Sequence, residues 1–139
     1  MSDWIRDDYC FACGKKNPYG LKLDIKTSDD GRSEVEFVPA REYQGYGGIL
    51  HGGIAATLLD ELMVYAAFGL GKPVVTVKLT VKYRKPVPVG RRIRVEAEVV
   101  NVSGRKVQAR GRITDMEGNI LVEGESLMYE VKSPSKIDG

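Results

Sequence analysis

Residues 45–69 constrain this chain of 139 residues more than any other stretch. They read GYGGILHGGIAATLLDELMVYAAFG, a glycine-rich loop followed by an apolar segment. Apolar residues recur at spacings of three and four, which predicts one helix of about five turns. The side opposite the apolar face is also poor in charge. We therefore expect a larger structure to wrap around this helix.

Two adjacent carboxylates, Asp60 and Glu61, interrupt the apolar helix. Successive helix residues point about 100° apart, so the two side chains cannot face the same group. Asp60 shares its flank with the small residues Ala56 and Ala67, where another molecule can approach closely. A carboxylate in apolar surroundings is costly to ionise, and such groups cluster at functional sites. We interpret Asp60 as catalytic or as a structural carboxylate bonded to a strand, and expect Glu61 to pair with a basic side chain.

The composition indicates one globular domain of modest charge. The chain has 21 Lys and Arg and 19 Asp and Glu, a net charge of +2, which argues against binding nucleic acid by bulk charge. We see no apolar run as long as a membrane span and no apolar signal core in MSDWIRDDYC, so we expect a cytoplasmic protein with no membrane partner. We assign residues 1–20 to an N-terminal segment, 21–131 to the domain and 132–139 to a flexible tail.

The rest of the chain has the alternating pattern of strands, with turn residues between them. Strands are predicted over residues 21–27, 33–38, 75–83, 92–102, 107–113 and 120–131. One buried helix and hairpin-linked strands give an α+β architecture, an antiparallel sheet curled around the helix. One helix cannot cover every strand edge, so we expect a homodimer or homotetramer.

Cys10 and Cys13 form a C-x-x-C motif. In a cytosolic protein these thiols are expected to be reduced or to bind a metal, and one such pair is half of a zinc site. Two interpretations remain open. The thiols are small packing groups in a structural turn, or two N-terminal segments meet in a dimer and supply four thiolates. We favour the turn and expect no metal.

GYGGILHGGIAATLLDE, followed by TVKLTVKYRKPVPVG, resembles the hotdog-fold acyl-CoA thioesterases, in particular the phenylacetate-degradation thioesterase-like branch. The similar region runs from about Leu21 to Val131, and CFACGKKNPYGLKL resembles a segment that precedes the hotdog domain in some members. The resemblance implies a long central helix wrapped by a curved antiparallel sheet, with active sites at a dimer interface. It also implies hydrolysis of acyl-CoA, with coenzyme A as part of the substrate and no separate cofactor.

The resemblance implies roles for individual residues of the helix and its loop. Asp60 matches the family carboxylate, which attacks the thioester or activates water. The developing oxyanion needs hydrogen-bond donors, and amides at a helix N-terminus, here Gly52 and Gly53, supply them. His51 is expected to orient this loop through hydrogen bonds rather than to act as the base.

Further positions match polar or binding positions of the family. Gln44 matches a polar position before the His-Gly-Gly. Thr76 matches a Ser/Thr position that faces the carboxylate from the partner subunit, or it is an ordinary outward-facing threonine of the strand. Basic residues near strand ends are either a solvated face or ligands for the phosphates of coenzyme A. The candidates for substrate binding are Arg84, Lys85 and Arg105 for coenzyme A and Tyr46, Leu50 and Met63 for an aromatic or medium aliphatic acyl group.

Three functions compete at this stage. The first is an acyl-CoA thioesterase. The second is a hotdog hydratase or dehydratase, which is expected to place a histidine within reach of the carboxylate. The third is a non-catalytic acyl-CoA-binding or regulatory module, in which Asp60 caps a ligand tunnel. The acyl group, and the choice between nucleophile and general base for Asp60, stay open.

Overall fold

The computed structural model describes residues 7–131, which form one long helix, one short 3-10 helix and six strands. Helix α1 spans Gly52–Gly69 and the 3-10 helix η1 spans Arg41–Tyr43. The strands are β1 (Lys26–Ser28), β2 (Arg32–Phe37), β3 (Val74–Tyr83), β4 (Ile93–Ser103), β5 (Lys106–Asp115) and β6 (Ile120–Glu130). The predicted tail, residues 132–139, lies outside the described residues, as do residues 1–6.

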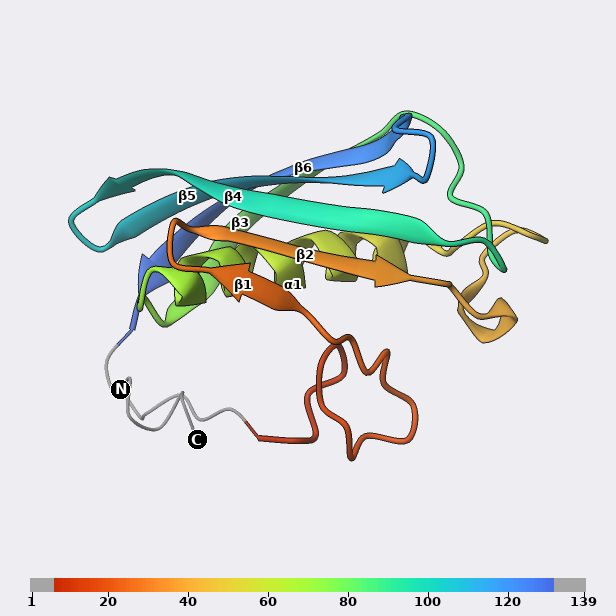
Figure 1. Cartoon of the computed structure of the whole chain (residues 1–139), viewed down its shortest axis with the longest axis horizontal. Helices are drawn as coiled ribbons and strands as arrows, with labels where there is room; N and C mark the ends of the chain where they lie inside the picture. Colours follow the sequence, from red (N-terminus) through yellow and green to blue (C-terminus); the bar gives the residue numbers. More distant parts are fainter. Residues whose placement is uncertain (1–6, 132–139) are drawn as a thin grey trace.

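The six strands form one antiparallel sheet in the order β1-β2-β4-β5-β6-β3. Strands β4, β5 and β6 follow one another through hairpins, and β3 closes the far edge beside β6. Figure 1 shows the curved sheet covering one side of α1. This arrangement is the hotdog fold, and it confirms the predicted α+β architecture.

The core lies between α1 and the concave side of the sheet. On the helix, Leu58, Leu59 and Leu62 are fully buried. Glycine brings the sheet close to the helix, because a Cβ at Gly124 would lie only 3.2 Å from a methyl group of Leu59. Burying each large apolar side chain contributes about 1.5–3 kcal/mol. The facing strands contribute the fully buried Ile93, Val95, Val107, Ile113, Val122 and Met128.

The sequence analysis expected no apolar run as long as a membrane span, and by length and composition this expectation is wrong. The 18 residues of α1 are long and apolar enough to cross a membrane. The same property suits a core helix, because a helix enclosed by a sheet needs apolar residues on most of its surface. In this fold the sheet covers one side of α1, and seven of the 18 helix residues are buried.

The predicted strand over residues 21–27 is reduced to β1 at its C-terminal end. Leu21 and Leu23 are buried as their alternation predicts. However, their amides donate to the carbonyl groups of Phe11 and Ala12 rather than to a strand of the sheet. Between them, Lys22 has a φ of 53°, outside the extended region. The N-terminal segment therefore packs into the core of the same domain.

Strand β3 contains an irregularity near its start. Thr76 pairs with Met128 and Lys78 pairs with Leu127, so Val77 has no partner on β6. Two residues on one strand then oppose one on the other, which is the definition of a β-bulge. The bulge lies on an edge strand, where such irregularities are frequent.

Candidate active site

The loop before α1 is held by side chains that the sequence singles out. His51 is the N-cap residue of α1, and its Nδ1 accepts a hydrogen bond of 2.9 Å from the Gly53 amide. Gln44 Oε1 accepts a hydrogen bond of 3.1 Å from the Gly48 amide. Gly48 has a φ of +80°, which only glycine adopts without strain. Gln44 thus stabilises the turn, and His51 orients the start of the helix.

The helix N-terminus offers one amide for a ligand in this conformation. The Gly53 amide is occupied by His51, whereas no acceptor for the Gly52 amide is found among residues 7–131. Helix N-termini carry partial positive charge, so this position favours a developing oxyanion. Of the two predicted oxyanion donors, the structure therefore leaves Gly52 available.

Tyr83, at the end of β3, is a site residue that the sequence analysis missed. Its hydroxyl group donates a hydrogen bond of 2.6 Å to the Gly52 carbonyl. A Cβ atom at Gly52 would lie 3.4 Å from the hydroxyl oxygen of Tyr83. In the sequence Tyr83 is one of several apolar-face residues of a strand, and no local pattern indicates that it meets the start of the helix.

Asp60 and Thr76 form the central polar contact of the site. Thr76 Oγ1 donates a hydrogen bond of 2.6 Å to Asp60 Oδ1, and both groups are partly buried. The bond is formed within one chain, and a contact of Thr76 with the carboxylate of the partner subunit stays a prediction. The bond within the chain follows from the path of β3, which returns alongside α1 from the end of the helix to its start. Thr76 thereby meets the middle of the helix, and Tyr83 meets its N-terminus.

Glu61 faces a different neighbour from Asp60. Its Oε2 accepts a hydrogen bond of 3.7 Å from the thiol of Cys10, and no ion pair to it is found among the described residues. The expected basic partner is therefore not found within residues 7–131. The turn that contains Cys10 covers this side of the helix.

The residues predicted to bind the acyl group lie in contrasting environments. Leu50 and Met63 are buried in the hydrophobic core, whereas Tyr46 is 85% exposed. Met63 is on α1, one turn after Asp60. In a single chain, Met63 and Leu50 therefore serve first as packing residues, and their contact with substrate remains a prediction.

The residues predicted to bind coenzyme A are on the surface. Arg84 forms an ion pair with Glu123 on β6, and Arg105 Nη2 donates a hydrogen bond of 3.0 Å to the Glu130 carbonyl. Lys85 is exposed beside Arg84. The two arginines thus have protein partners in this structure, and a phosphate would have to compete with these contacts or join them.

A hollow of about 880 Å³ lies on the outer face of the sheet. It is bordered by cross-strand ion pairs, Arg110 with Glu98 at 3.4 Å and Arg112 with Glu96 at 3.6 Å. These residues alternate along β4 and β5 with buried side chains that face α1. Because Asp60 is not among the lining residues, we assign the candidate active site to the contact between α1 and β3 instead of this hollow.

The fold and the site together define a hotdog protein with a hydrogen-bonded carboxylate on its central helix. The chain belongs to the thioesterase superfamily, whose sequence pattern matches residues 47–122. This match covers the glycine-rich loop, the helix and strands β3 to β5. The resemblance to the hotdog thioesterases is therefore confirmed.

Several known proteins similar to this chain are named thioesterases. Acyl-coenzyme A thioesterase THEM4 of Xenopus laevis is 33% identical over 85 residues, which are 61% of this chain and 38% of THEM4. A solved thioesterase superfamily protein has a TM-score of 0.84 at 25% identity, covering 94% of this chain and 68% of that protein. The PaaI protein of E. coli, from the phenylacetic acid degradation operon, shares the fold with a TM-score of 0.76 at 18% identity, covering 81% and 82%. The chain spans only 38–55% of the length of three curated relatives.

Proposed function

We propose that this chain hydrolyses acyl-CoA thioesters to a free acid and coenzyme A. The observation that carries the proposal is the hydrogen bond of 2.6 Å from Thr76 to Asp60 on the central helix. This bond fixes Oδ1 of Asp60, whereas Oδ2 accepts no hydrogen bond from any group within residues 7–131. The carboxylate is thus oriented with one oxygen available for chemistry, as a nucleophile or general base requires. The match to the thioesterase superfamily and the similarity to THEM4 support the substrate class.

Two mechanisms are compatible with this geometry. As a nucleophile, Asp60 Oδ2 attacks the thioester carbon and the thiolate of coenzyme A leaves. Water then hydrolyses the acyl-enzyme anhydride. As a general base, Asp60 takes a proton from a water molecule that attacks the same carbon. In both cases the negative charge on the carbonyl oxygen requires a donor, for which we propose the Gly52 amide.

The competing functions are less well supported. A hydratase or dehydratase is expected to use a histidine as acid or base near the carboxylate, but His51 uses Nδ1 to cap its own helix. A non-catalytic binding module has no need for a precisely held carboxylate. Release of free thiol from a panel of acyl-CoA thioesters separates hydrolysis from both alternatives and identifies the acyl group.

We further propose that the active protein is a homodimer or homotetramer. Strand β3 forms one edge of the sheet, and the apolar side chain of Val77 on this strand is 54% exposed. An unprotected edge of this kind favours pairing with a second copy. Light scattering at micromolar concentration is expected to give at least the dimer mass, and a pure monomer would contradict the proposal.

Substitution of the carboxylate tests the catalytic assignment. Asp60→Asn keeps the shape of the side chain and removes the base or nucleophile, so kcat is expected to fall by roughly 10²–10⁴. KM is expected to change little, because the lost interaction belongs to the transition state. Glu61→Gln, the matched neighbour whose side chain contacts Cys10 instead, is expected to cost less than about tenfold. Near-normal turnover of Asp60→Asn, or a larger loss for Glu61→Gln, would refute the assignment.

A further inference from the structure

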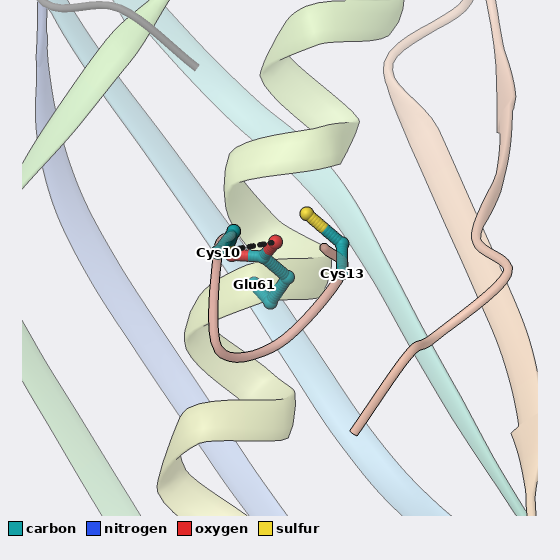
Figure 2. Close-up of side chains that lie close together, drawn as sticks. All are labelled: Cys10, Cys13 and Glu61. Atoms are coloured by element: carbon teal, nitrogen blue, oxygen red, sulfur yellow. Dashed lines mark hydrogen bonds between the residues drawn. The ribbon is translucent and has the colours of Figure 1, made fainter. Parts of the chain in front are cut away.

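Three groups with affinity for metal ions converge on the side of α1 that faces the N-terminal segment. The Sγ atoms of Cys10 and Cys13 and a carboxylate oxygen of Glu61 all lie within 4.8 Å of one another, and the three residues are partly buried. Figure 2 shows the turn with both cysteines lying across the helix and Glu61 extending toward it. Several strands of the sheet pass behind the helix in this view. Glu61 contacts Cys10, whereas its neighbour Asp60 contacts Thr76 on β3, so the cluster is separate from the contact between Asp60 and β3.

The spacing of these atoms fits a tetrahedral ion. With Zn–S bonds of about 2.3 Å and Zn–O bonds of about 2.1 Å, tetrahedral neighbours lie about 3.6 Å apart for S and O and about 3.8 Å apart for two S atoms. The distance of 3.7 Å from Cys10 Sγ to Glu61 Oε2 matches the first value. The other two pairs of ligand atoms lie within 4.8 Å of each other. Side-chain movements of about 1 Å would therefore bring them to the tetrahedral distances.

The turn that presents the thiols is tightly built. The Gly14 amide donates a hydrogen bond of 2.8 Å to the Cys10 carbonyl, and the Lys16 amide donates one of 2.9 Å to the Asp8 carbonyl. A Cβ at Gly14 would lie 2.3 Å from the Asp8 carbonyl oxygen, so only glycine is compatible with this packing. The two thiols are consequently held on one side of the turn without requiring a long ordered loop.

The donor set determines which ion is favoured. Thiolates are soft ligands that select zinc over magnesium or calcium, which prefer sets composed only of oxygen atoms. We propose that Cys10, Cys13 and Glu61 bind one zinc ion per chain, with a water molecule in the fourth position. This differs from the sequence analysis, which expected no metal and considered only a four-thiolate site shared between two chains. Glu61 is the ligand that the sequence did not reveal, because it is 51 residues from Cys10.

Binding has a defined proton balance and a structural consequence. Each thiol loses one proton when it becomes a zinc ligand, including the proton that Cys10 donates to Glu61, so two protons are released per ion. The ion links the N-terminal segment to the middle of α1. Because this binding free energy is absent from an unfolded chain that cannot bring the ligands together, zinc stabilises the folded state. The proposal does not depend on the thioesterase activity.

Cobalt titration tests the site directly. Full-length protein, purified without a metal-affinity step and stripped with a chelator under reducing conditions, is titrated with Co²⁺. We expect a thiolate-to-cobalt absorption band that saturates at one equivalent per chain and disappears when Zn²⁺ is added. Zinc is also expected to raise the melting temperature. Cys10→Ser and Cys13→Ser are expected to abolish the band. Glu61→Gln is expected to weaken zinc binding by at least about tenfold, a loss seen even for outer-shell partners.

Glu117→Gln provides the matched control, because Glu117 is an exposed glutamate in the turn between β5 and β6. It is expected to bind zinc like the unmodified protein. No thiolate band in the unmodified protein would overturn the proposal, even if a cysteine variant fails to fold. Saturation at half an equivalent per chain would indicate the four-thiolate site between two chains instead. Unchanged affinity in Glu61→Gln would remove the carboxylate from the ligand set.

Discussion

Thr76→Val removes one hydrogen bond from the proposed catalytic carboxylate and changes little else. Valine has the shape of threonine and is equally suited to a strand. The lost bond, 2.6 Å from Thr76 Oγ1 to Asp60 Oδ1, has a carboxylate acceptor, and such bonds contribute about 1.5–3 kcal/mol when buried. Both groups here are only partly buried, so we take the lower end. If that energy orients the carboxylate in the transition state, kcat falls by about tenfold.

The assay is release of coenzyme A thiol from the best acyl-CoA substrate, with kcat and KM determined separately. Thr76→Ser retains the hydroxyl group and is expected to keep most of the activity, whereas Thr76→Val loses it with little change in KM. Thermal melting must show that both variants are folded. Near-normal kcat in folded Thr76→Val, or an equal loss in Thr76→Ser, would show that the hydroxyl group does not orient Asp60 for catalysis.

Three further predictions concern the surface, the core and a turn. Alanine at Arg84, Lys85 and Arg105 is expected to raise KM for acyl-CoA but not for a short pantetheine thioester, which lacks the nucleotide phosphates; equal effects would indicate a solvated face. The Ser126 hydroxyl group is buried without a hydrogen-bond partner in the described structure, so Ser126→Ala is expected to raise the free energy of unfolding by up to about 1 kcal/mol in denaturant titrations. Hydrogen bonds from the side chain and then the backbone of Asn119 lower the pKa of Asp115 below its ordinary value of 3.8. The ionised Asp115 therefore stabilises the folded state above pH 3.8, and this stability is lost as the pH falls through the lower pKa of the folded state. Asp115→Asn is expected to be destabilising at neutral pH but not in strong acid.

Most of the fold could be predicted from local patterns. The helix and five of the six strands follow from apolar periods of 3.6 and 2 within single segments. The segment over residues 21–27 shows where this reasoning fails. Leu21 and Leu23 alternate in burial as a strand would, but their amides bond to Phe11 and Ala12. Periodicity reports which side chains are buried and does not identify the backbone partner.

The candidate site was predictable only in part, for a related reason. Asp60 and the helix N-terminus are evident because they belong to one continuous stretch. The bond from Thr76 to Asp60 within the chain depends on the path of β3 after the helix, which no local pattern shows. The partner of Glu61 depends on where the N-terminal turn docks. Contacts between distant segments are decided by packing, which a single sequence does not display.

The β-bulge at Val77 determines which side chains of β3 face the helix. Thr76 and Tyr83 are seven positions apart, and in a regular strand an odd separation directs two side chains to opposite faces. Here both reach the helix, Thr76 at Asp60 and Tyr83 at Gly52. Val77, which is unpaired between Thr76 and Lys78, shifts the alternation of side chains by one residue. Thr76 and Tyr83 therefore both face the helix. If β3 paired with β6 without this bulge, one of the two side chains would face away from the helix, and the strand could not both orient the carboxylate and contact the start of the helix.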